Sequence, residues 1–183
     1  MLFFDTETTG LIRNAALHVS KQPHIIELGL LRFPEIPDRP SQFGIVLKPP
    51  IKIPEIITKI TGLTDADVED APQFGDIVEE LADFVKGETQ MVAHNMPFDM
   101  GMLLFELRRE GWDEKFPMPA ELIDTVVMAQ PFYRGKFMKL QKLHEDLVGP
   151  YEQKHRAIDD CIMLQAVYNA LRDKQDAACG YSR

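Results

Sequence analysis

Cysteine is scarce in this sequence of 183 residues, which contains only Cys161 and Cys179. Two cysteines cannot build a disulfide framework, and neither has a second cysteine at the C-x-x-C spacing of a metal site. Long hydrophobic runs are also absent, since no stretch approaches the roughly 20 apolar residues of a spanning helix. The starting letters MLFF lead directly into acids, without the basic region of a secretory leader. We therefore expect a cytoplasmic protein with no membrane partner.

Basic residues are in the minority. The sequence has 20 Lys and Arg against 29 Asp and Glu, a net charge of −9, which argues against a protein that holds nucleic acid on a broad basic surface. A nucleic-acid enzyme is still compatible with this charge. Carboxylates that hold divalent cations make the count more acidic, while the bound cations supply positive charge where a phosphate lies.

Repeats, low-complexity tracts and long linkers are absent, which favours one domain at 1–175 and a flexible tail at 176–183, where apolar periodicity is lost. Apolar runs predict strands at 1–5, 24–33, 42–48, 90–93 and 121–128. Helical spacing predicts helices at 54–60, 72–86, 97–109, 139–147 and 156–173. Three neighbouring strands followed by alternating helices and strands indicate an α/β fold, a five-stranded mixed sheet flanked by helices.

A pair of acids ends the first expected strand. Asp5 and Glu7 are two residues apart, so both project from one face of the strand. Two adjacent carboxylates repel unless a cation lies between them. Chance alone predicts about one Asp-x-Glu triplet in a chain of this composition, and a second copy at 67–69 lies in an acidic run that is typical of a solvated surface. The first copy differs because a wholly apolar strand precedes it and a turn follows it.

The segment 94–99, HNMPFD, also joins a strand to a helix. Its ordinary interpretation makes Asn95 a helix N-cap and Asp99 a first-turn acid favoured by the helix dipole, which leaves a functional role for Asp99 open. His94 directly follows a buried strand, so we expect it to be structural and hydrogen-bonded. Asp124, near the end of the fifth expected strand, is expected to be structural or to orient a metal ligand.

The segment 155–160, HRAIDD, begins the last expected helix. At about 100° per residue, Asp160 lies within about 60° of the centre of the apolar stripe of this helix, whereas Asp159 lies about 160° away. A carboxylate beside a buried stripe is costly unless it is paired, and a metal ion is a natural partner. We expect His155 to lie in the loop before the helix, from which it can reach the same site.

Basic and aromatic residues alternate at 132–142, FYRGKFMKLQK. Two interpretations are open for this segment. It could contact the phosphates and bases of a single strand, or it could be an amphipathic helix with a solvated basic face.

Together these motifs resemble those of the DEDDh 3′→5′ exonucleases, the DnaQ-like family that includes the proofreading epsilon subunit of DNA polymerase III, ribonuclease T and oligoribonuclease. FDTETTGL at 4–11 is similar to the first exonuclease motif of the family, HNMPFD at 94–99 to the second and HRAIDD at 155–160 to the third. The three motifs occur in the expected order and span nearly the whole chain. The resemblance implies a ribonuclease-H-like fold, which agrees with the order of elements above.

The resemblance also implies roles for individual residues. It implies two divalent metal ions, Mg²⁺ with Mn²⁺ as a substitute, held by four acids: Asp5, Glu7, Asp99 and Asp160. His155 would be the general base. Four further residues would bind nucleotide: Thr8 beside the terminal nucleotide, Leu11 as a wedge between the last two bases, and Asn95 and Phe98 in the lining of the pocket.

The expected function is therefore hydrolysis of phosphodiester bonds at 3′ ends, with release of nucleoside 5′-monophosphates from single-stranded or frayed DNA. The alternatives are an exoribonuclease with the same chemistry and a catalytically silent nucleic-acid-binding or polymerase-docking module. The intact set of four acids and His155 counts against a silent module. The expected partner is a nucleic acid with a free 3′ end, and a polymerase or other replication protein and a homodimer are further candidates.

Overall fold

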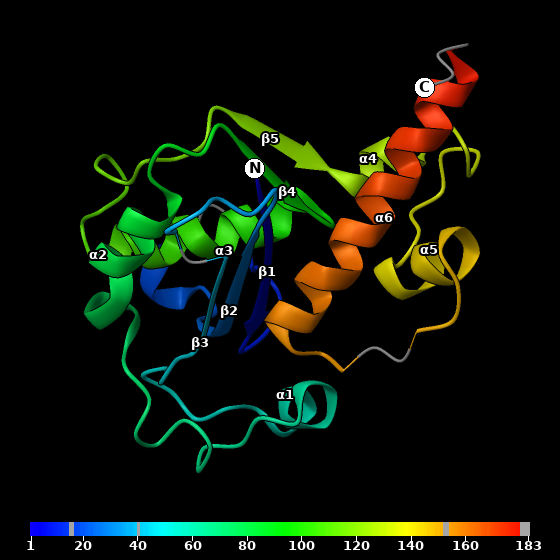
Figure 1. The fold of residues 1–183 in the computed structure, drawn as a ribbon. Coiled ribbons are helices and arrows are strands. Elements are labelled where there is room, and N and C mark those ends of the chain that lie inside the picture. Colours follow the sequence, from blue (N-terminus) through cyan, green and yellow to red (C-terminus); the bar gives the residue numbers. More distant parts are fainter. Residues whose placement is uncertain (15–16, 40, 152–153, 180–183) are drawn as a thin grey trace.

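A five-stranded mixed sheet forms the centre of the structure, a computed structural model that describes residues 1–14, 17–39, 41–151 and 154–179 (Figure 1). In spatial order its strands are β3 (Gln42–Val46), β2 (Ile25–Arg32), β1 (Leu2–Thr8), β4 (Gln90–Ala93) and β5 (Glu121–Asp124). The first three strands in sequence pair antiparallel, whereas β1 with β4 and β4 with β5 pair parallel. The carboxyl ends of β1, β4 and β5 therefore meet at one edge of the sheet.

Helices cover both faces of the sheet (Figure 1). On one face, α2 (Phe74–Val85) and α3 (Met96–Arg109) pack against Leu2 and Phe4 of β1. On the other face, α5 (Leu140–Leu147) and α6 (Ala157–Ala178) pack against Phe3. The remaining helices are the short η1 (Val19–Lys21), α1 (Glu55–Thr61) and α4 (Thr125–Ala129). No described helix combines the length and the apolar character needed to cross a bilayer.

The predicted order of strands and helices is confirmed, with one correction in the segment predicted as a strand at 121–128. The strand β5 ends at Asp124, and the next five residues form α4. The Asp124 side chain accepts a hydrogen bond from the backbone N–H of Val126 and so caps this helix. At the other end of the chain, α6 continues to Ala178, three residues into the expected tail, and 180–183 lie outside the described residues.

Two glycines allow α6 to lie close to the sheet. Gly29 of β2 is paired with Gly44 of β3 on one side and with Asp5 of β1 on the other, so the three form one row across the sheet. A Cβ atom on Gly29 would lie 2.6 Å from the carbonyl carbon of Ala157, and one on Gly44 would lie 2.5 Å from Ile158. The first turn of α6 therefore packs directly on the backbone of β2 and β3. This close contact brings the residues after Ile158 toward Asp5, which is paired with Gly29.

We predict that Gly29→Ala destabilises the fold, because the added methyl group must displace the backbone of Ala157 and with it the start of α6. The expected loss is about 1–3 kcal/mol in the free energy of unfolding, measured by urea denaturation. Gly101→Ala is the matched control, since its Cβ would meet only the end of the flexible Ile12 side chain. The control should be unchanged or stabilised by up to about 1 kcal/mol, and equal losses in both variants would contradict this account.

Candidate active site

Acids of β1 line the face of the sheet that α6 covers. Asp5 and Glu7 alternate with Phe4 and Thr6, so they project from the same face as Phe3, against which α6 packs. Glu7 is paired across the strands with Glu27 of β2, which is buried. Two carboxylates on opposed residues of neighbouring strands repel one another, so this part of the sheet concentrates negative charge.

An arginine beside the third motif neutralises Glu27. The Arg156 Nε atom lies 3.0 Å from both carboxylate oxygens of Glu27, and its Nη2 atom lies 2.9 Å from Oε1. The pair joins the residue before α6 to the middle of β2. The sequence analysis missed both residues, and the only signal was an acid inside the otherwise apolar run HIIELGLL.

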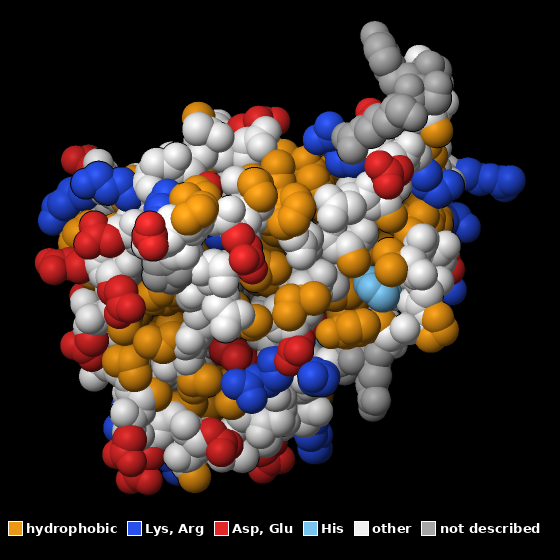
Figure 2. Space-filling model, in the orientation of Figure 1, with side chains coloured by type: hydrophobic (Ala, Val, Ile, Leu, Met, Phe, Trp, Pro, Cys, Tyr) orange, Lys and Arg blue, Asp and Glu red, His pale blue; other side chains and the backbone are white. Residues whose placement is uncertain are grey.

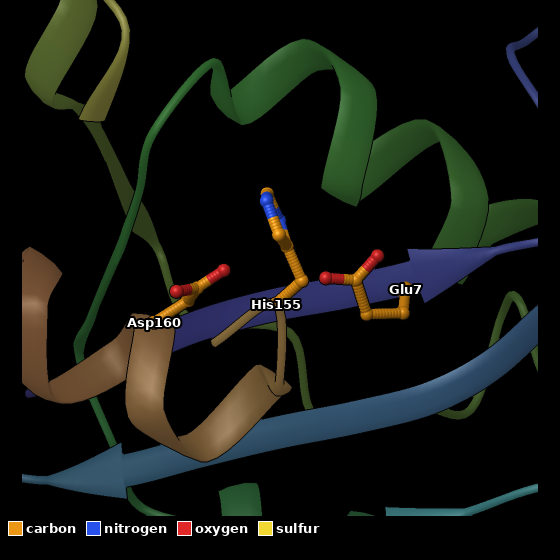
Figure 3. Close-up of side chains that lie close together, drawn as sticks. All are labelled: Glu7, His155 and Asp160. Atoms are coloured by element: carbon orange, nitrogen blue, oxygen red, sulfur yellow. The ribbon is translucent and has the colours of Figure 1, made fainter. Parts of the chain in front are cut away.

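The start of α6 brings two further predicted residues to this face. Asp160 is 3% exposed, whereas Asp159 is partly exposed and lies 3.3 Å from the Lys154 ammonium group, which confirms the prediction that Asp160 is the acid that faces the core. His155 lies in the loop before α6, as expected, with a left-handed backbone (φ 50°). One ligand atom from each of Glu7, His155 and Asp160 lies within 4.8 Å of the others (Figure 3).

Figure 3 shows how these three side chains lie. Glu7 comes from β1 and Asp160 from the first turns of α6, and the His155 side chain stands between their carboxylates in this view. Asp5 and Asp99 are not members of this group of three, but they interact with it, because in addition to burial the charge of Asp99 raises the pKa of Glu7 and the charges of Asp160 and Glu7 raise the pKa of Asp5. The structure therefore brings Glu7, His155 and Asp160 together and places Asp5 and Asp99 within electrostatic reach of them.

Asp99 is held from the other side of β1. It is 4% exposed in the first turn of α3, and its Oδ1 atom accepts hydrogen bonds from the backbone N–H (3.0 Å) and the hydroxyl (2.7 Å) of Thr6. Because both bonds go to one oxygen, the carboxylate is oriented with its second oxygen available. The sequence analysis did not identify Thr6. The only signal for it was its position between Asp5 and Glu7.

The residues beside Asp99 fix the turn that enters α3. Asn95 is not the side-chain N-cap of the ordinary interpretation, because its backbone is left-handed (φ 70°) and its N–H donates to Asp124 Oδ1 at 3.0 Å. His94 lies 2.9 Å from the Thr125 hydroxyl and 2.8 Å from the Met138 carbonyl oxygen. Burial lowers the pKa of His94. The predicted structural roles of His94 and Asp124 are confirmed by these bonds.

The nucleotide-binding candidates differ in exposure. Thr8 is buried, and its hydroxyl donates to the Gly10 carbonyl oxygen at 2.9 Å. Leu11, in the loop after β1, is 81% exposed, whereas Phe98 is half-buried against the core beneath α3. An apolar side chain as exposed as Leu11 has little to pack on within the described chain, in contrast to Thr8 and Phe98.

Burial disfavours the charged forms of three of these acids, and nearby carboxylates add to the effect. Burial, together with the charges of Asp160 and Glu27, raises the pKa of Glu7 to about 8. Burial raises the pKa of Asp99 to about 7, although the hydrogen bonds from Thr6 act in the opposite direction. Burial and then the charges of Asp99 and Asp160 raise the pKa of Asp5 well above its usual range. Such a group of carboxylate oxygens fits hard divalent cations, which would relieve the repulsion.

Comparisons with known proteins bear on the family to which this chain belongs. A family model described as exonuclease matches residues 2–168. DNA polymerase III subunit epsilon of Treponema pallidum is 34% identical over 96% of this chain and 79% of the relative. The epsilon subunit of Pasteurella multocida is 28% identical over 91% of this chain and 66% of the relative. The 3′-5′ exonuclease DinG of Bacillus subtilis is 30% identical over 73% of this chain but only 14% of its own length.

Solved structures show the same fold. The nuclease domain of 3′hExo, a DEDDh family member bound to rAMP, aligns with a TM-score of 0.70 at 21% identity, over 96% of this chain and 91% of that one. Exonuclease X in complex with 5′ overhanging duplex DNA aligns with a TM-score of 0.63 at 23% identity, over 94% of this chain and 91% of that one. This likeness confirms the predicted ribonuclease-H-like α/β fold.

The family match covers all three sequence motifs, at 4–11, 94–99 and 155–160. These are also the segments that bring the acids together at the edge of the sheet. The chain therefore belongs to the exonuclease family, whose DEDDh members its motifs resemble.

Proposed function

We propose that this chain is a metal-dependent 3′→5′ exonuclease that removes nucleoside 5′-monophosphates from the 3′ ends of single-stranded or frayed DNA, with residues 1–175 as its catalytic domain. The observation that carries the proposal is the convergence of Glu7, His155 and Asp160 from separate parts of the chain, beside the partly exposed Asp5 and the buried Asp99. A silent binding module has no need to bear the repulsion among these groups. The epsilon subunits and the exonuclease among the relatives support the same reaction and its direction.

Asp5, Glu7, Asp99 and Asp160 would hold two divalent cations, Mg²⁺ with Mn²⁺ as a substitute. Four carboxylates balance the charge of two such ions, and oxygen ligands suit both metals. When bound, the cations supply positive charge at the scissile phosphate and make the attacking water more acidic. The hydrogen bonds from Thr6 orient Asp99 for this task by occupying only one of its oxygens.

His155 would act as the general base that takes a proton from the attacking water. Imidazole exchanges protons near neutral pH, and a positioned base of this kind contributes typically 10²-fold or more to the rate. The loop that carries His155 is anchored at the next residue, because Arg156 is paired with Glu27 of β2. The same ion pair neutralises Glu27 beside Glu7.

Four residues would bind the 3′-terminal nucleotides. Leu11 would separate the last two bases, a role that its highly exposed apolar side chain supports. Thr8 would lie beside the terminal nucleotide, and Asn95 and Phe98 would line its pocket, since both belong to the segment that positions Asp99.

A polymerase or another replication protein is a candidate partner because of the epsilon relatives. A homodimer and a cytoplasmic location are further proposals, the latter supported by two free cysteines.

A degradation assay tests the reaction and its substrate. Labelled single-stranded DNA, duplex DNA, duplex DNA with mismatched 3′ ends and RNA are each incubated with Mg²⁺, Mn²⁺ or EDTA. We expect metal-dependent release of 5′-monophosphates from the 3′ end, fastest on single-stranded and mismatched DNA. Faster degradation of RNA would instead favour the exoribonuclease. Intact substrates under every metal condition would overturn the proposed activity.

The raised pKa values predict an unusual dependence of stability on pH. The pKa values of Glu7, about 8, and Asp99, about 7, exceed those of unfolded carboxyls near 4, so the folded state binds more protons between about pH 4 and 8. The metal-free protein should therefore lose stability as pH rises through this window. Mg²⁺ binds deprotonated acids, so it should raise the melting temperature more at pH 8 than at pH 5.

Scanning calorimetry in EDTA and in Mg²⁺ measures this effect. Glu7→Gln should melt at a higher temperature than the parent at pH 8 in EDTA and gain less from Mg²⁺, while Glu79→Gln, an exposed acid of α2, should behave like the parent. An equal effect of Mg²⁺ at both pH values would contradict the proposed metal site.

Substitution of His155 separates a base from a metal ligand. We expect His155→Ala to lower kcat on single-stranded DNA by 10²-fold or more, while the increase in melting temperature caused by Mg²⁺ at pH 8 is retained. His18→Ala, which removes an exposed histidine, serves as the control. A kcat within about tenfold of the parent would rule out the base role, and loss of the Mg²⁺ effect would make His155 a ligand instead.

A further inference from the structure

A loop rich in basic residues joins α4 to α5 beside the site. Residues 130–139, which we call the basic loop, are not the amphipathic helix of one sequence interpretation, because α5 begins only at Leu140. The loop turns sharply at Arg134 (φ 55°) and Gly135 (φ 73°). Of the four cations noted in the sequence, Arg134, Lys136 and Lys139 lie in it and are exposed.

These three cations differ from their neighbours in having no partner. Within the described residues, their side chains make no hydrogen bond or ion pair. Nearby cations are paired, for example Lys142 with Asp146 at 2.8 Å and Lys154 with Asp159 at 3.3 Å. Figure 2 shows Lys and Arg side chains projecting on the right, where Figure 1 places the loop, and further basic groups at the left and lower centre. In a chain of net charge −9, the basic loop is a local positive surface.

The basic loop is fixed to the edge of the sheet that carries the acids. His94, which directly follows β4 and precedes Asn95, lies 2.8 Å from the Met138 carbonyl oxygen. The Phe137 ring lies edge-on to the His94 ring, with centroids 6.0 Å apart, and its side chain is 60% exposed. An exposed aromatic ring among unpaired cations, next to the site, has the composition of surfaces that track single-stranded nucleic acid.

We propose that the basic loop binds the substrate strand upstream of its 3′-terminal nucleotides. Arg134, Lys136 and Lys139 contact successive phosphates, and Phe137 offers a face for stacking by an unpaired base. This inference rests on the proposed function for the identity of the substrate as a single strand. It adds a binding surface outside the three motifs and explains how an acidic protein holds a polyanion: attraction is confined to this loop and to the metal site.

Binding and catalysis are measured separately to test the proposal. Fluorescence anisotropy in EDTA gives the Kd of a labelled 20-nucleotide single strand, which is not cleaved under these conditions. Hydrolysis of the p-nitrophenyl ester of thymidine 5′-monophosphate in Mg²⁺ reports on the metal site alone, because this substrate has no upstream strand. The variant Arg134→Gln/Lys136→Gln/Lys139→Gln is compared with Arg108→Gln/Lys86→Gln/Lys115→Gln. The control also removes three positive charges. Arg108 lies near the end of α3, and Lys86 and Lys115 line a pocket beside α2.

We expect the loop variant to bind the strand at least tenfold more weakly and to reduce the slope of log Kd against log salt concentration by about 2, since each phosphate contact to a single strand contributes about 0.7. Its hydrolysis of the ester should match the parent. Phe137→Ala should weaken binding about fivefold or more with little change in the salt slope. The control variant should bind like the parent.

A loop variant with the Kd and salt slope of the parent would overturn the proposal, even if the parent degrades DNA. The same holds if the control variant loses as much affinity, since the effect would then be one of net charge. Loop-dependent binding by a parent that hydrolyses neither substrate would uphold the loop and overturn the exonuclease activity. If instead the loop served an acidic protein partner, single-stranded DNA would not bind through it and the Kd would not change.

Discussion

The crowding of four carboxylates, with Asp99 and Asp160 buried and Asp5 and Glu7 partly exposed, is the constraint on which the site depends. Asp5, Glu7 and Asp99 all have raised pKa values, because burial and neighbouring acids disfavour their charged forms. These groups do not serve the stability of the fold, since well-packed hydrophobic residues of similar volume would be at least as stable in their place. Divalent cations remove the conflict by supplying the missing positive charge. The cost of the arrangement without metal is thus the physical reason to regard it as a metal site.

The surrounding scaffold positions Asp160, Asp99 and the segment next to His155 by three different devices. Gly29 and Gly44 leave room for the first turn of α6, so that Asp160 comes close to β1. Thr6 fixes Asp99 with two hydrogen bonds from the opposite face of the same strand. The ion pair between Arg156 and Glu27 anchors the segment next to His155. Because these devices come from separate elements, the geometry of the site reports on the packing of the whole domain.

Local patterns in the sequence predicted most of the fold, and together with the family resemblance they supplied the candidate site residues. Apolar runs located the strands, and helical periodicity distinguished Asp160 from Asp159 before any contact was known. The end of β5 was misplaced because a short apolar run does not distinguish strand from helix, and the cap formed by Asp124 decided it. Thr6 and Glu27 escaped notice because their partners lie 93 and 129 residues away in sequence. Such long-range pairing has no local signal.

The most direct measurement is the anomalous scattering of Mn²⁺ in crystals of the protein grown or soaked with this ion. The account predicts anomalous peaks among the carboxylates of Asp5, Glu7, Asp99 and Asp160, and their loss in crystals of Asp160→Asn. A protein that degrades DNA while its crystals show Mn²⁺ only elsewhere, or not at all, would contradict the central claim that these acids form the metal site.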